Sequence, residues 1–248
     1  MTTARDLSVQ LWTVRSLLAE DLDRTLATIA EIGFRLVEPF DLLAYAGGLR
    51  TSLSRHGLAA PTTHVDVLGG AADRAFDAAA SLGIETVVQP WVDPARWETV
   101  EDVRRLADDL NRAAVGAARH GLRVGYHNHH FELAAIFDSR HGLDVFAEHL
   151  APDVVLEVDT YWAFAGGADV PALLNRLADL VVALHIKDGD GSLDPKRQVA
   201  AGSGVIPIPA ILAAAPNALR VVELDDTAGD LLEAVRASRQ FLMGAADV

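Results

Sequence analysis

One short pattern recurs along this chain: an amphipathic helix pattern ends, a single glycine follows, and an apolar strand pattern begins. It occurs as AEIGFRLVE around Gly33, SRHGLAA around Gly57, ASLGIETVV around Gly83 and ARHGLRVGY around Gly121. Helices commonly stop at a residue with positive φ, which glycine adopts without steric cost, so these four positions are predicted helix caps. The repeated passage from helix to strand indicates an α/β fold.

Eight strand patterns and eight helix patterns alternate along the chain. Strands are predicted near 7–12, 35–38, 59–65, 84–91, 122–127, 154–159, 180–187 and 219–224. Helices are predicted near 22–32, 49–56, 70–82, 97–120, 142–150, 169–178, 207–214 and 228–242. The strands are short, β-branched and nearly apolar, as is typical of strands buried on both faces.

A closed (β/α)8 TIM barrel uses every one of these elements in order. We therefore expect one domain over residues 1–248, with an open doubly wound sheet as the alternative. No G-x-G-x-x-G follows the first strand, which argues against a Rossmann dinucleotide site.

The charge and composition exclude several classes of protein. The formal net charge of −14 argues against nucleic-acid binding and against an anionic membrane surface. The absence of cysteine excludes disulfides, a thiolate zinc site and a cysteine nucleophile. The N-terminal MTTARDLSV has no apolar signal core, and no apolar run is long enough for a membrane span. We therefore expect a cytoplasmic protein, and a homo-oligomer is left open.

Polar side chains gather at the C-terminal ends of the predicted strands. In a (β/α)8 barrel, the active site lies at this end. In strand order they are Gln10 and Trp12; Glu38; His64 and Asp66; Gln89 and Trp91; His127, His129 and Glu132; Asp159; His185 and Lys187; Glu223 and Asp225. Residues two apart on a strand share a face, so each strand-end pair points the same way. This clustering distinguishes an enzyme from a plain barrel scaffold.

A metal ion would explain several of these side chains. Asp159, His185 and Glu223 each follow a buried-looking apolar run, and a buried charge without a partner is very costly. One divalent metal per chain would supply that partner, with His127 of GYHNHHFEL as the fourth ligand. His129 and Glu132 are the alternatives on the same segment. The mixed ligands favour Mn²⁺, Zn²⁺ or Co²⁺, while Mg²⁺ is less suited to two imidazoles.

The chain resembles the sugar phosphate isomerase/epimerase family with the xylose isomerase-like TIM barrel, a group that also holds inosose dehydratase, the ketose 3-epimerases and endonuclease IV. The resemblance covers nearly the whole chain and rests on SVQLWTVR, GFRLVE, YHNHHFEL, VDTYWAFAGGAD, LHIKD, GSGVIPI and VVELDD. These motifs are specific for the superfamily, and none identifies a substrate.

The resemblance implies one metal held by Glu, Asp, His and Glu from strands five to eight. Asp159, His185 and Glu223 match three of these ligands, and His127 stands at or beside the position where the ketose epimerases have glutamate. It also implies that Glu132 contacts the hydroxyl groups of the sugar. The YHNH form is more similar to the inosose dehydratase branch, where β-elimination occurs.

The function expected from these residues is a metal-dependent isomerase or epimerase of a keto sugar or a sugar-like cyclitol. The metal would stabilise an enediolate formed by proton abstraction next to a carbonyl. Glu223 is the predicted base, His127, His64 or Glu132 returns the proton, and Lys187 offsets charge on the oxygen. Predicted substrate-binding residues are His64, Gln10, Trp12, His129 and Trp162.

Two other functions stay open at this stage. The histidine at position 127 favours a lyase, either of the inosose dehydratase type or one that eliminates a keto-glycoside. A non-catalytic sugar-binding barrel subunit is the alternative from another class. The long glycine-rich segment 188–206 is typical of a lid, and its GSG could bind phosphate through backbone N–H groups. The acidic chain nevertheless favours a neutral sugar.

Overall fold

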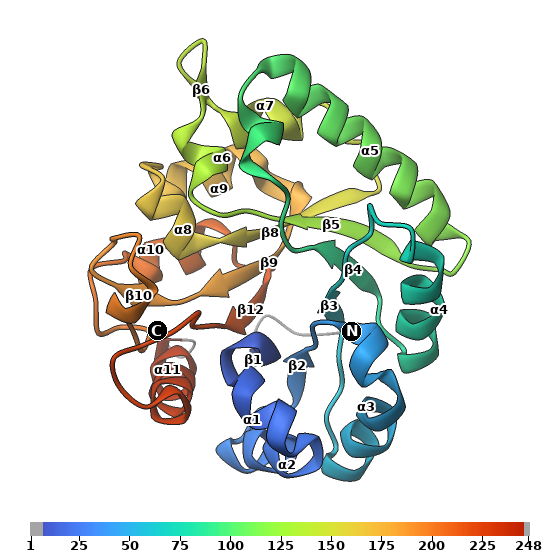
Figure 1. Ribbon diagram of the computed structural model, residues 1–248. Coiled ribbons are helices and arrows are strands. Elements are labelled where there is room, and N and C mark those ends of the chain that lie inside the picture. The colour runs from blue at the N-terminus through green and yellow to red at the C-terminus, as the bar shows by residue number, and fades with distance from the viewer. Residues whose placement is uncertain (1–6, 246–248) are drawn as a thin grey trace.

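Over residues 7–245, the part of the chain that the computed structural model describes, eight parallel strands form one sheet (Figure 1). Their order in the sheet is β2-β1-β12-β9-β8-β5-β4-β3. The strands are β1 (Leu7–Gln10), β2 (Leu36–Glu38), β3 (Thr62–His64), β4 (Thr86–Gln89), β5 (Arg123–His127), β8 (Val154–Asp159), β9 (Val181–Ile186) and β12 (Leu219–Val222). Each of the eight predicted strands is present, although most are shorter than predicted.

The sheet closes on itself where its two end strands meet. An isolated parallel bridge joins Leu36 at the start of β2 to Ala59, just before β3. Two backbone hydrogen bonds hold this junction: Val37 N–H donates to Ala59 O at 2.9 Å, and Ala59 N–H donates to Arg35 O at 3.0 Å. The fold is therefore the predicted TIM barrel and not the open sheet.

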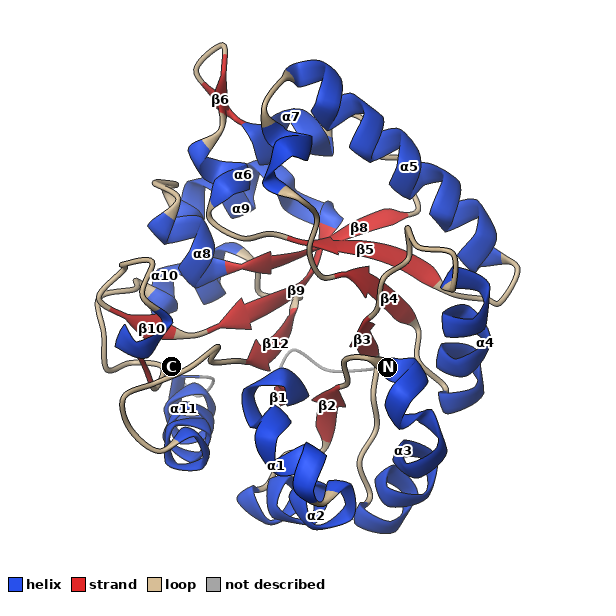
Figure 2. Cartoon of the chain, in the orientation of Figure 1, coloured by secondary structure: helices blue, strands red, loops and turns tan. Residues whose placement is uncertain are grey.

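Helices surround the ring of strands on the outside (Figure 2). They are α1 (Arg15–Glu20), α2 (Leu22–Ile32), α3 (Leu42–His56), α4 (Ala72–Leu82), α5 (Val100–Ala118), α6 (Phe131–Ala134), α7 (Gly142–Ala147), α8 (Thr160–Ala165), α9 (Val170–Leu177), α10 (Ile208–Ala214) and α11 (Leu231–Ala245). All eight predicted helices are present. The short helices α1, α6 and α8 were not predicted, and α3 begins seven residues before the predicted 49–56.

Three of the four predicted glycine caps, Gly33, Gly57 and Gly83, are confirmed, whereas α5 ends at Ala118 and is capped by Arg119, so Gly121 lies beyond the helix. The φ angles are +108° at Gly33, +64° at Gly57, +77° at Gly83 and +74° at Gly121, all in the range that a side chain disfavours. Gly33, Gly57 and Gly83 thus end their helices, and Gly121 turns the chain toward β5 after α5 has ended.

Helix α5 shows how the apolar periodicity packs the barrel. Thr99 caps its N-terminus by accepting a hydrogen bond from the Asp102 N–H. Val103, Leu106 and Leu110 recur at helical spacing and are fully buried. Each such side chain contributes about 1.5–3 kcal/mol through burial, which holds the helix against the strands.

Two small hairpins lie outside the barrel sheet. One joins β6 (Ile136–Phe137) to β7 (Arg140–His141) and projects from the body of the molecule (Figure 1). The other joins β10 (Asp188–Gly189) to β11 (Gln198–Val199) within the segment predicted as a lid. Among the helices described, none combines the length and apolar character that crossing a membrane would require.

Candidate metal centre and substrate pocket

Four strand-end side chains that the sequence singled out lie together. His127 ends β5, Asp159 ends β8, His185 lies near the end of β9, and Glu223 directly follows β12. All four are buried, and one ligand atom from each lies within 4.8 Å of the others. Register explains part of this proximity, because Asp159 and His185 are partners across β8 and β9. Residues far apart in the chain therefore meet at the mouth of the barrel.

The contacts show which atoms face the centre of this group. Nε2 of His127 lies 3.7 Å from Oδ2 of Asp159, and Nδ1 of His185 lies 2.8 Å from Oε2 of Glu223. Oδ1 of Asp159 accepts a hydrogen bond from Trp162 N–H at 2.8 Å and so caps α8. Asp159 thus serves both as a helix cap and as part of the cluster. Two imidazoles and two carboxylates form a donor set that suits Zn²⁺ or Mn²⁺, so these residues fit a divalent metal.

Lys187 holds the carboxylates of this region together. It is fully buried, and its Nζ lies 2.8 Å from Asp159, 2.6 Å from Glu223 and 2.8 Å from Asp225. Burial opposes the charge of Lys187, but these three carboxylates keep its pKa well above the ordinary value. Burial raises the pKa of Asp159 to about 6 even though Lys187 opposes that shift. The cluster therefore carries more negative charge than one ammonium neutralises, which favours an additional cation.

A deeper layer of polar side chains lies beneath the four ligand candidates. Glu38 and Glu157 are buried there together with His64. Nε2 of His64 lies 2.6 Å from Oε2 of Glu157, and Nε2 of His185 lies 2.7 Å from Oε1 of Glu38. The sequence analysis missed Glu157 altogether. The signal that could have found it was its spacing two residues before Asp159, which puts both side chains on one face of β8.

Two imidazoles of the site, those of His185 and His127, differ in how readily they take a proton. Burial opposes the charge of His185, but Glu157, Glu223 and Glu38 raise its pKa well above the ordinary value. Burial and the charge of His185 lower the pKa of His127 well below its ordinary value. His127 therefore stays neutral and keeps a lone pair for a ligand or a proton.

Glu132 is fixed behind the site. It is fully buried, with Oε1 accepting from the Tyr126 hydroxyl at 2.8 Å and Oε2 accepting from His129 N–H at 2.9 Å. Burial raises its pKa to about 8. Asn128, which the sequence analysis also missed, accepts a hydrogen bond from Asp159 N–H at 3.0 Å. These contacts fix the end of β5 against the end of β8.

A cavity of 420 Å³ opens above the cluster. Its lining residues are Trp12, Phe40, Asp41, His64, Val65, Asp66, Pro90, Trp91, His127, His129, Glu223 and Asp225. Trp12 and Trp91 are 41% and 51% exposed, so two large rings stand available at its mouth. The base of the cavity thus offers imidazole and carboxylate groups, while its rim offers aromatic faces.

The predicted substrate residues fall into two groups. His64, His129 and Trp12 line the cavity. Gln10 does not: it is buried, donates to Glu38 at 2.7 Å and accepts from the Trp12 N–H at 3.0 Å. Trp162 is also buried and lies 5.6 Å from the Lys187 ammonium. Direct substrate contact by Gln10, Trp162, Lys187 and Glu132 therefore stays a prediction.

The backbone N–H groups of the GSG segment are engaged inside the protein. The carboxylate of Asp188 accepts hydrogen bonds from Gly202 and Gly204, each at 3.0 Å. Ser203 N–H donates to Ala200 O at 3.0 Å. The carboxylate of Asp188 therefore already occupies the backbone N–H groups that a substrate phosphate would have to bind.

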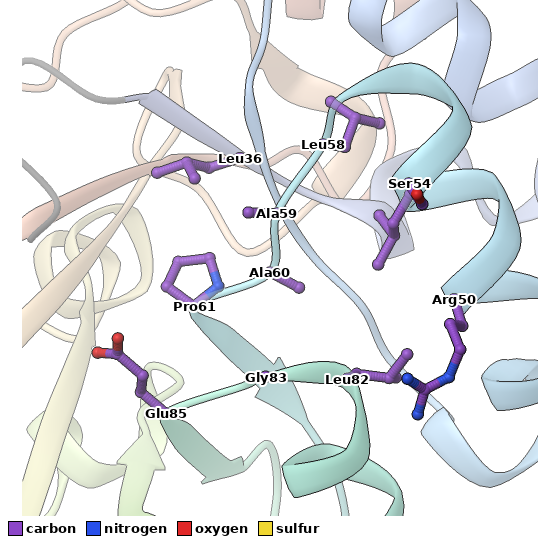
Figure 3. A pocket seen from close by; sticks show the side chains of 11 residues that line it. Leu36, Arg50, Ser54, Leu58, Ala59, Ala60, Pro61, Leu82, Gly83 and Glu85 are labelled. Carbon is purple, nitrogen blue, oxygen red and sulfur yellow. The ribbon is translucent and has the colours of Figure 1, made fainter.

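A second hollow, of 510 Å³, lies beside the N-terminal ends of the strands (Figure 3). Leu36 and Pro61 mark the starts of β2 and β3 there, and Arg50 and Glu85 stand on opposite sides of the view. Its other lining residues are mostly apolar. Because no imidazole lies among them, this hollow lacks the chemistry that the strand ends provide.

Comparisons with known proteins agree with this architecture. The family model described as xylose isomerase-like TIM barrel matches residues 13–219. An inosose dehydratase from Geobacillus kaustophilus is 28% identical over 160 residues. That match covers 60% of this chain and 49% of the relative, so the chain spans about half the length of that curated relative.

Two solved structures show the same fold over nearly the whole chain. A sugar phosphate isomerase/epimerase from Parabacteroides distasonis superposes with a TM-score of 0.79 at 23% identity, covering 98% of this chain and 95% of the other. The IolI protein, described with a bound zinc atom, superposes with a TM-score of 0.74 at 16% identity, covering 98% of each chain.

Proposed function

The chain belongs to the xylose isomerase-like TIM barrel family, and we propose that it is a metal-dependent isomerase or epimerase of a neutral keto sugar or cyclitol. One observation carries the proposal: His127, Asp159, His185 and Glu223 place ligand atoms within 4.8 Å of one another, and His127 and Glu223 also line the 420 Å³ cavity. The Parabacteroides structure with the isomerase/epimerase description and the zinc of the IolI structure support it.

The same four side chains would hold the metal, with two imidazole nitrogens and two carboxylate oxygens as ligands. When bound there, a divalent metal supplies Lewis acidity to a carbonyl oxygen and so makes the neighbouring C–H more acidic. Lys187, whose Nζ lies 2.8 Å from Asp159 and 2.6 Å from Glu223, keeps both carboxylates oriented. The metal is Zn²⁺, Mn²⁺ or Co²⁺ on the chemistry of the donors.

Glu223 is the proposed base. Burial opposes its charge, but Lys187 and His185 hold its pKa well below the ordinary value, so it is ionised. Oε2 lies 2.6 Å from Nζ of Lys187 and 2.8 Å from Nδ1 of His185, on the side of the proposed metal, which leaves Oε1 to accept the proton from the substrate carbon. His64 lines the cavity with Nε2 held by Glu157, and its Nδ1 is the atom that would return the proton.

The proposed substrate is uncharged. The cavity lining contains the carboxylates of Asp41, Asp66, Glu223 and Asp225 and neither lysine nor arginine. A phosphate group would therefore meet like charges without a compensating cation. The glycine-rich segment offers no substitute, because Asp188 occupies its N–H groups. Trp12 and Trp91 provide aromatic faces that suit the apolar side of a sugar ring.

A lyase is the second candidate. Two points favour it: the resemblance implies glutamate in the ketose epimerases at or beside position 127, where this chain has histidine, and the curated relative is an inosose dehydratase. On this reading Glu223 still removes a proton, and a group on the opposite face protonates a departing hydroxyl. Epimerisation incorporates solvent deuterium at one carbon, whereas elimination releases water or an aglycone, so analysis of the product in D₂O separates the two.

The proposal is tested by removing the metal and by changing one ligand. Protein dialysed against a chelator should lose turnover on a panel of keto sugars and inososes, and Mn²⁺ or Zn²⁺ should restore it. Asp159→Asn should abolish that recovery. Asp169→Asn is the matched control, because Asp169 is an exposed cap of α9 that accepts Ala172 N–H at 3.1 Å just as Asp159 caps α8. Full turnover by metal-free protein would overturn the proposal, and metal binding without any turnover would favour the non-catalytic alternative.

A further inference from the structure

His127 and His185 each have one upper ring nitrogen, on the side of Asp159 and Glu223, and one lower ring nitrogen, on the side of Glu38 and Glu157. Nε2 of His127 faces Asp159 at 3.7 Å, while its Nδ1 lies 3.2 Å from Oε2 of Glu157. Nδ1 of His185 faces Glu223 at 2.8 Å, while its Nε2 lies 2.7 Å from Oε1 of Glu38. The upper nitrogens belong to the group that would hold a metal, and the lower nitrogens meet a separate pair of carboxylates.

We propose that Glu38 and Glu157 are positioning residues that fix the proton of each imidazole on its lower nitrogen. His127 is then protonated at Nδ1 and His185 at Nε2, so that the lone pairs of Nε2 and Nδ1 point to one common point above them. The inference rests on the proposed metal site, and it explains how two histidines can both direct a lone pair at one metal. Neither carboxylate touches the substrate in this arrangement.

The hydrogen-bond capacity of the two carboxylates supports this assignment. One carboxylate oxygen has two lone pairs. Oε2 of Glu157 lies 2.6 Å from Nε2 of His64, 3.1 Å from Nε2 of His185 and 3.2 Å from Nδ1 of His127. Oε1 of Glu38 uses its two lone pairs for His185 at 2.7 Å and Gln10 at 2.7 Å. With the protons on Nδ1 of His127 and Nε2 of His185, each of these histidine contacts places an N–H donor on a carboxylate acceptor, and the two carboxylates restrain the ring orientations.

The burial of these groups strengthens the constraint. Glu38 is 0% and Glu157 is 1% exposed, so water does not compete for their oxygens. The imidazole rings also restrain one another, because the ring centres of His127 and His185 lie 4.5 Å apart. A histidine that binds metal usually donates its other N–H to such a carboxylate, and loss of that partner typically costs about 10–100-fold in metal affinity.

The alternative is that the lower carboxylates themselves bind the metal. His64, His127, Glu157 and His185 also place ligand atoms within 4.8 Å of one another. In that case the metal would lie on Nδ1 of His127 and Nε2 of His185, the opposite nitrogens from those proposed. The two arrangements therefore differ in an observable atom.

Nitrogen-15 NMR of histidine-labelled protein loaded with Zn²⁺ distinguishes them. We expect metal on Nε2 of His127 and on Nδ1 of His185, with a slowly exchanging proton on the other nitrogen of each ring. Metal on the opposite nitrogens would overturn the inference in favour of the lower cluster. An absence of zinc from both rings would instead refute the proposed metal site itself, so the two failures are distinguishable.

Single variants complete the test. Glu157→Gln should speed proton exchange at His127 and at His185, because its Oε2 lies near both rings, whereas Glu38→Gln should speed it at His185 and leave His127 unchanged. Each should raise the zinc dissociation constant about 10–100-fold while one zinc per chain still binds. Glu85→Gln, an exposed glutamate at the far end of the barrel, is the control and should change neither quantity. Should Glu157→Gln fail to fold, Glu157→Asp keeps the charge but shortens the reach to His127 and should show the same effect. Unchanged affinity and exchange in both folded variants would contradict the assignment.

Discussion

Replacing Glu132 by glutamine should change how the stability of the protein depends on pH. Glu132 is fully buried, and burial raises its pKa to about 8 from the ordinary 4.5. The folded protein therefore keeps this proton between pH 4.5 and 8, whereas the unfolded chain releases it. Because the unfolded state then binds fewer protons, the free energy of unfolding falls as pH rises through this window.

The size of the change in unfolding free energy follows from the difference between the pKa of Glu132 in the folded protein and its ordinary value. Each pKa unit corresponds to about 1.4 kcal/mol, so Glu132 alone should remove on the order of 2–3 kcal/mol of stability between pH 5 and pH 7. Glutamine resembles the protonated acid: its carbonyl can accept from the His129 N–H, and its amide can donate to the Tyr126 hydroxyl. The variant should lack this loss because it has no proton to release.

Urea unfolding of both proteins at pH 5, 6, 7 and 8 measures the difference directly. The stability of Glu132→Gln relative to the wild type should rise by that amount from pH 5 to pH 7. Any constant cost of the additional amide hydrogen cancels, because only the change with pH is compared. Glu85→Gln, at an exposed position, should run parallel to the wild type. A Glu132→Gln curve that also runs parallel would show that Glu132 is ionised in the folded protein and would refute the reasoning.

Three further changes have definite expected outcomes. Lys187→Met leaves three carboxylates without their ammonium and should lower the free energy of unfolding of the metal-free protein by about 3–5 kcal/mol. Added Zn²⁺ should recover part of this loss. Equal stability of the variant and the wild type would contradict the ion network. Asp188→Ala removes the acceptor that organises the segment 189–206, so hydrogen exchange should accelerate within that segment; unchanged protection would show that the carboxylate does not hold it. Gly33→Ala, at φ +108°, should destabilise by more than about 1 kcal/mol in a urea titration, whereas Gly47→Ala in open space within α3 should stabilise; equal effects would refute the role of the glycine cap.

The sequence predicted the barrel well because its elements carry strong local signals. Gly33, Gly57 and Gly83 stop helices through their own backbone freedom, and α5 shows its buried face in the spacing of Val103, Leu106 and Leu110. The β6–β7 hairpin and α8 were missed for a physical reason. Strands β6 and β7 have two residues each and α8 has six, which is too few for a periodic apolar pattern to appear in the sequence. Helix α8 is also capped by Asp159, the aspartate that faces the site.

The site was predictable to the extent that strand ends converge in a barrel. His127, Asp159, His185 and Glu223 follow from that rule, and the structure brings them together. Spacing does not show which polar group neutralises which, so the burial of Lys187 among three carboxylates could not be foreseen. Glu157 could have been found, since a charged residue inside an apolar strand and two positions before Asp159 must share its face.

The binding of one metal by these strand ends is the central claim, and anomalous diffraction from a crystal soaked with Zn²⁺ tests it most directly. We expect a single strong peak about 2.0–2.2 Å from a nitrogen of His127, an oxygen of Asp159, a nitrogen of His185 and an oxygen of Glu223. A peak confined to His64 and Glu157, or no peak at the mouth of the barrel, would contradict the account.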